Sequence, residues 1–102
     1  MLATWVPDVL RAAGLTVVTY PGWETRSHGE IRTPMSVVWH HDASGVGDSP
    51  GVPAAMSRRW DSGDGIAAQS WVDRAGAWHI IASGVAWHAG RVLPGKPSNA
   101  FR

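Results

Sequence analysis

The feature that most constrains this chain is a pair of short strand-like runs joined by a tight polar turn. The runs are AAQSWVD (67–73) and AWHIIA (77–82), and Arg74-Ala75-Gly76 lies between them. Two such runs, separated by a few residues that include a glycine, are typical of a β-hairpin. The second half of the chain is therefore predicted to form part of a β-sheet.

Other segments have the composition of short helices, strands and loops. Residues 5–13 are predicted to form a helix, because Thr4 can cap it, Pro7 lies in its first turn and Gly14 follows its end. The remaining expected elements are a strand at 15–20, a polar surface segment at 23–34, a central strand at 36–41, a short helix at 54–60 and an extended piece at 84–90. This order predicts a mixed α/β fold with a central β-sheet flanked by helices.

Size and composition indicate one small globular domain. The chain has 102 residues, of which 44% are hydrophobic and 17% are charged, and this balance suits a folded rather than a disordered protein. Nine basic and eight acidic residues give a net charge of +1, which argues against a nucleic-acid partner. No apolar run reaches membrane-spanning length. The start, MLATWVPDVLRAAGL, lacks the cationic region of a signal peptide, so we expect a protein made in the cytoplasm.

Two adjacent histidines end the predicted central strand in VVWHHDASG (37–45). Neighbouring residues of a strand point to opposite faces, so at most one of His40 and His41 can bind a given metal ion. The chain has no cysteine, so a zinc ion would need His and carboxylate ligands, and a catalytic site needs about three of them. Spacing alone favours ordinary polar residues at a strand end over a metal site.

Several separated stretches of the chain resemble the type-2 N-acetylmuramoyl-L-alanine amidases, whose fold is shared with peptidoglycan recognition proteins and many phage endolysins. VVWHHDASG is similar to the family's strand-to-loop signature. SWVDRAGAWHIIASGVAWHAG (70–90) resembles its hairpin and the "WHAG" segment that follows. PGWETRSHGEIRTP (21–34) and KPSNAFR (96–102) resemble flanking stretches in amidases from phages of actinobacteria.

The resemblance implies a zinc-dependent enzyme that cleaves the amide bond between N-acetylmuramic acid and L-alanine of bacterial peptidoglycan. His40 matches the first zinc ligand of the family. His41, Asp42, Trp87 and His88 match residues that flank the site or line the substrate cleft. No catalytic residue is assigned with certainty within the chain. The implied protein stays in the host cytoplasm and acts on the cell wall after release, with neither a membrane nor a nucleic acid as partner.

The sequence also departs from the family. Ala75 replaces the Asp of the hairpin turn, AAQSW lacks a Tyr found in some members, and the chain stops before the segment that carries the other zinc ligands and a glutamate. We therefore expect residues 1–102 to be the N-terminal part of a single amidase domain, incomplete and inactive alone, with an exposed sheet edge that favours a homo-oligomer. A natural short product that recruits His79, His88 or Asp42 as ligands is the other interpretation.

Two further classes of function stay open. Relatives of this fold without full zinc ligation bind peptidoglycan without cutting it, so a non-catalytic binding module is the main alternative. A metal-dependent nuclease is disfavoured by the near-neutral charge. By itself, His79 is expected to be structural or to face solvent.

Overall fold

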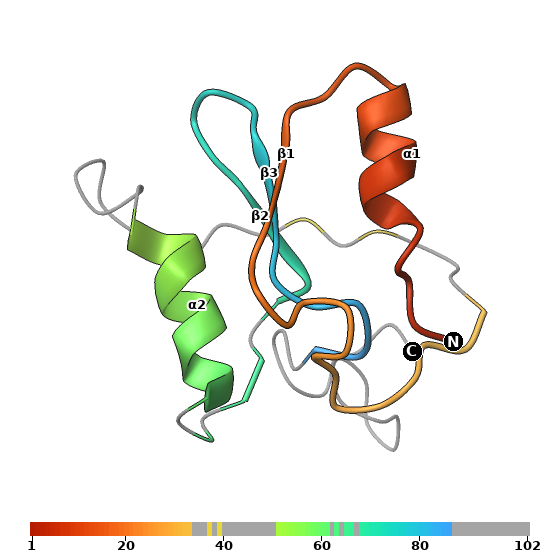
Figure 1. The fold of residues 1–102 in the computed structure, drawn as a ribbon, viewed down its shortest axis with the longest axis vertical. Coiled ribbons are helices and arrows are strands. Elements are labelled where there is room, and N and C mark those ends of the chain that lie inside the picture. Colours follow the sequence, from red (N-terminus) through yellow and green to blue (C-terminus); the bar gives the residue numbers. More distant parts are fainter. Residues whose placement is uncertain are drawn as a thin grey trace.

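The computed structural model describes residues 1–33, 37, 39, 51–61, 63, 65, 66 and 68–86. They form a small mixed α/β domain with a three-stranded sheet and two helices (Figure 1). The predicted class of fold is confirmed at this level. No helix in the described part of the chain is long and apolar enough to cross a membrane.

The sheet is built on the predicted hairpin. Strand β2 (Ser70–Val72) pairs antiparallel with β3 (Trp78–Ile80), and β1 (Val17–Thr19) pairs parallel with the other edge of β3, which gives the order β1-β3-β2. The central strand is therefore β3. The turn between β2 and β3 closes with Gly76 at a φ of 87°, a left-handed conformation that glycine adopts at no steric cost.

Both predicted helices are present. Helix α1 (Val6–Ala12) contains Pro7 in its first turn, and α2 (Val52–Asp61) extends the predicted 54–60 helix at both ends. Helix α1 contacts β1, and the two helices lie on opposite sides of the strands (Figure 1). Trp5, which precedes α1 as its N-cap, and Val9 within the helix are 45% and 56% exposed.

The core lies around the segment that follows β3. Residues 80–86 are all buried, and Ile81, Ala82 and Ala86 pack with Ile66 in one apolar cluster. Val85 packs with Ala3 and Ile31 in a second cluster. The segment that follows β3 is thus packed against residues from several distant parts of the chain.

The polar segment 23–34 was expected at the surface, and this prediction is wrong for Trp23, Arg26 and Ile31, which are buried. The segment folds back onto residues 81–85. His28 N–H donates to the Val85 carbonyl at 3.0 Å, and Val85 N–H donates to the Gly29 carbonyl at 2.9 Å. These hydrogen bonds satisfy the backbone N–H and C=O groups of the segment where it is buried. The polar composition of the segment was therefore a poor predictor of its burial.

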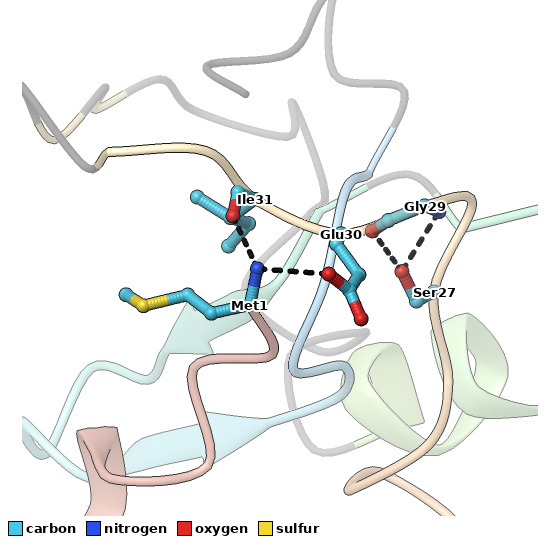
Figure 2. A network of polar contacts seen from close by, with 5 residues as sticks. All are labelled: Met1, Ser27, Gly29, Glu30 and Ile31. Atoms are coloured by element: carbon cyan, nitrogen blue, oxygen red, sulfur yellow. Dashed lines mark hydrogen bonds and ion pairs between the residues drawn. The ribbon is translucent and has the colours of Figure 1, made fainter.

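A polar network at the start of the chain fixes the same segment (Figure 2). The Met1 ammonium donates to the Ile31 carbonyl at 2.6 Å and forms an ion pair with Glu30 at 3.2 Å. Nearby, Gly29 N–H donates to the Ser27 hydroxyl at 2.8 Å, and that hydroxyl donates to the Gly29 carbonyl. A short loop that contains Ser27 and Gly29 is thereby held in one conformation.

This loop packs closely against Gly84. A Cβ at position 84 would lie 2.7 Å from the Gly29 carbonyl oxygen and would also clash with the Ser27 side chain. Only glycine therefore permits this approach of the two backbones.

Two predicted segments fall mostly outside the described residues. Of the 36–41 strand, Val37 and Trp39 are described; neither lies in a strand, and they are 73% and 67% exposed. Of the 84–90 extended piece, residues 84–86 are described and are buried without belonging to a strand.

Candidate functional site

The described residues bring three titratable side chains together on one face of the sheet. Val18 and Trp71 both lie opposite His79 in the strand register. Tyr20 lies two residues after Val18, and Asp73 lies two residues after Trp71. Side chains two residues apart share a face of an extended chain. The order of the strands thus places Tyr20 and Asp73 on the two sides of His79.

Both ring nitrogens of His79 are engaged. Its Nδ1 lies 2.9 Å from the Tyr20 hydroxyl oxygen, and its Nε2 lies 2.9 Å from Asp73 Oδ2. An ionised carboxylate can only accept a hydrogen bond, so Nε2 carries a hydrogen. In the neutral imidazole, Nδ1 is then the acceptor, and the Tyr20 hydroxyl donates to it.

Asp73 is held by the hairpin turn. Its Oδ1 accepts hydrogen bonds from the backbone N–H groups of Ala75 and Ala77, each at 2.9 Å. The hydrogen bond from His79 and these backbone donors hold the pKa of the Asp73 carboxyl below its ordinary value. Asp73 is therefore an ionised, fixed group that orients the ring of His79.

Tyr20 joins the cluster to the core. Its ring packs against the cluster of Ile66, Ile81, Ala82 and Ala86, and its backbone N–H donates to the Ile80 carbonyl at 3.2 Å. Burial, and secondarily the negative charge of Asp73, raise the pKa of the Tyr20 hydroxyl. Tyr20 is thus a protonated hydrogen-bond donor at neutral pH.

The cluster is partly open to solvent. The side chains of His79 and Asp73 are 14% and 26% exposed. The Trp71 ring lies beside His79, with centroids 5.6 Å apart. On the other side of β3, the rings of Trp39 and Trp78 meet edge to face at 5.3 Å. Chemically, a hydroxyl, an imidazole and a carboxylate in a chain can pass a proton from one end to the other.

The residues predicted for the site from the sequence lie outside the described residues. These are the proposed zinc ligand His40 and the proposed substrate contacts His41, Asp42, Trp87 and His88. In the part of the chain that the structure describes, no three His, Asp or Glu side chains are grouped so that they could hold a metal ion. His79, the alternative ligand, uses both ring nitrogens in hydrogen bonds and does not fit that role in this arrangement.

Sequence reasoning did not assign the Tyr20–His79–Asp73 cluster. Of the two roles expected for His79, the structure agrees with the structural one and not with the solvent-facing one, because the ring is mostly buried and hydrogen-bonded at both nitrogens. Asp73 and His79 flank a predicted hairpin turn, so their proximity could have been inferred from it. Tyr20 is 59 residues from His79, and its place depends on the parallel pairing of β1 with β3.

Comparisons of the chain with models of protein families, with characterised proteins and with solved structures found no match.

Proposed function

We propose that this chain belongs to a peptidoglycan amidase that cleaves the bond between N-acetylmuramic acid and L-alanine with the help of zinc. The observation that carries the proposal is the ordered pair of sequence motifs, VVWHHDASG and SWVDRAGAWHIIASGVAWHAG. The β2–β3 hairpin formed by the second motif is compatible with it. A zinc ion would polarise the scissile carbonyl and activate water.

In this proposal His40 binds the metal, and His41, Asp42, Trp87 and His88 contact the glycan or the peptide stem. Trp87 offers a broad apolar face and one N–H donor, which suits a sugar ring or a peptide. His88 and Asp42 offer hydrogen bonds. The described residues supply the sheet on which the second motif begins.

A non-catalytic module that binds peptidoglycan is the second candidate. It is favoured by the departures from the family pattern, namely Ala75 in the hairpin turn and the AAQSW stretch without tyrosine. The two candidates differ in their need for a metal with several protein ligands and an open position for water.

The deciding experiment combines a zinc titration with an assay on purified peptidoglycan. The intact chain and a His40→Ala variant are titrated with zinc by calorimetry, and new amino groups of L-alanine are then counted after incubation with the wall. If the chain is part of an amidase, it binds zinc, alone or as a homo-oligomer, and loses this binding in His40→Ala; release of amino groups would show in addition that the site is complete. Sedimentation of the chain with the wall, without zinc binding or amine release, would favour the binding module instead.

A further inference from the structure

We infer that residues 1–3 form a strap that fixes the buried segment 83–86, the segment that leads to the proposed substrate contacts. The strap joins two parts of the chain that are distant from it, residues 30–31 and residues 83–85. Trp87 follows Ala86 directly in the sequence. The order of segment 83–86 therefore determines where the chain that carries Trp87 and His88 begins. This link to substrate binding rests on the proposed function, whereas the contacts of the strap do not.

One end of the strap is paired with Ile31 (Figure 2). The Met1 ammonium donates to the Ile31 carbonyl at 2.6 Å, and the Ile31 N–H donates to the Met1 carbonyl at 2.9 Å. Two residues that exchange both hydrogen bonds in this way are directly opposed, as in an antiparallel sheet. The Glu30 carboxylate adds an ion pair with Met1, but its side chain is 78% exposed, so water screens this pair. The backbone pairing with Ile31 therefore holds this end of the strap.

The other end of the strap is joined to the segment after β3. The Ala3 N–H donates to the Ser83 carbonyl at 2.7 Å. The Ala3 side chain, 9% exposed, packs with Ile31 and Val85 in one apolar cluster. A single residue of the strap thus contacts both distant parts of the chain at once.

Segment 83–86 depends on tertiary contacts of this kind. Its residues are buried but belong to neither a helix nor a strand, so no ladder of regular hydrogen bonds holds them. The Val85 N–H and carbonyl are bonded to Gly29 and His28 instead. Loss of the strap removes a hydrogen bond and an apolar contact from this segment. We therefore expect the segment to open locally, which would release the start of the proposed substrate-binding stretch.

The first test opens the strap in the full chain with Ala3→Asp, because an unpaired carboxylate is strongly disfavoured in an apolar cluster. Thr4→Asp is the matched control, since it adds the same charge at the next residue, which is exposed. Amide hydrogen exchange is followed by NMR in both variants. The Ile31 N–H donates to the strap itself and should exchange at least about tenfold faster in Ala3→Asp. If Ala3→Asp does not fold, the same comparison is made with Ala3→Gly, which removes only the apolar methyl group.

The deciding amides are those of Ser83 and Val85. Their acceptors are carbonyls in residues 26–29, outside the strap, so their exchange reports on the segment itself. Both should exchange about tenfold faster in Ala3→Asp and at the wild-type rate in Thr4→Asp. Unchanged rates for these two amides would overturn the inference, because the strap would then be a local contact without influence on the segment.

The Trp78 N–H separates local opening from general loosening. It donates to the Thr16 carbonyl beside the sheet at 2.8 Å, far from the strap in sequence. Local opening of segment 83–86 leaves this hydrogen bond intact, so its exchange rate should stay that of the wild type. Equal acceleration of this amide and of the amides in 83–86 would mean that the whole domain is loosened, and it would also overturn the role of the strap.

Sedimentation with purified peptidoglycan connects the strap to the proposed function. The apparent Kd for the wall should rise at least about threefold in Ala3→Asp, because only molecules with a closed segment are competent to bind. Thr4→Asp should bind like the wild type. Equal binding by Ala3→Asp, despite fast exchange in 83–86, would overturn the link to substrate binding and leave the proposed function standing. A wild type that neither binds zinc nor sediments with the wall would overturn the proposed function, and the exchange rates would still decide the strap.

Discussion

His28 is a half-buried histidine whose ring accepts a hydrogen bond from a distant backbone group. The Ile66 N–H donates to His28 Nε2 at 2.8 Å, so this nitrogen must be unprotonated in the folded chain. Burial lowers the pKa of His28 below its ordinary value of 6.5. Folding therefore favours the neutral ring, and acid works against it.

This arrangement predicts a pH-dependent stability. Because the pKa is lower in the folded chain, the unfolded chain binds more protons once the pH falls below 6.5, so the free energy of unfolding should fall from there down to the folded pKa. Glutamine at position 28 can still accept from Ile66 but does not titrate in this range. Urea denaturation between about pH 7.5 and pH 5.5 should therefore show a shallower decline for His28→Gln than for the wild type. Equal declines would assign the acid sensitivity to other groups.

At the scale of single residues, the sequence pattern did not indicate which polar side chains bind distant backbone groups. The sequence around His28 does not indicate a role for its side chain, and Arg26 lies in the segment 23–34 that was predicted to be polar surface. Arg26 is buried and His28 is half-buried, and each forms a hydrogen bond with a distant backbone group, Ile81 for Arg26 and Ile66 for His28. No local pattern encodes such a partner.

Arg26 joins two elements across the interior. It is 3% exposed, and its guanidinium donates to the Ile81 carbonyl at 2.6 Å and to the Pro21 carbonyl at 2.7 Å. The planar, forked group reaches the turn after β1 and the residue after β3 at the same time. Its Nε has no hydrogen-bond partner among the described residues.

Lysine at this position should lose the bridge. Its single ammonium cannot serve both carbonyls in the same geometry, so one buried acceptor is left unpaired at a cost of about 1–3 kcal/mol in the free energy of unfolding. Arg11→Lys is the matched control, because Arg11 donates to the Val17 carbonyl at 3.4 Å from an exposed position. Chemical denaturation of both variants measures the difference. Equal, small effects would mean that Arg26 contributes no more than a surface contact.

At the scale of elements, the local structures could be predicted and their pairing could not. Helix α1, helix α2 and the hairpin follow from short-range signals such as Pro7, Gly14 and the Gly76 turn. The parallel pairing of β1 with β3 joins Val17 to Trp78, and nothing in either strand specifies the other. The Tyr20–His79 contact depends on that pairing, so this half of the candidate site was beyond the sequence pattern.

For the molecule as a whole, the segment from Ile80 to Ala86 is where distant parts of the chain meet. Backbone hydrogen bonds join it to Ala3, to Tyr20, to the 26–29 loop and to Gln69. The segment has no regular secondary structure after Ile80, yet its residues are among the most buried in the described part of the chain. Its order comes from tertiary contacts, because each neighbouring segment satisfies one or two of its backbone groups.

Amide hydrogen exchange should reveal this arrangement. The N–H groups of Ile81, Ala82, Ser83 and Val85 are bonded to partners far away in the chain, so they can exchange only when several segments separate together. The amides of α1 belong to a seven-residue helix with Trp5 and Val9 exposed, and a helix this short opens locally at little cost. NMR exchange rates should therefore be slowest in 81–85 and markedly faster in α1. If α1 were protected as strongly as 81–85, the domain would open as one unit and the central role of this segment would be wrong.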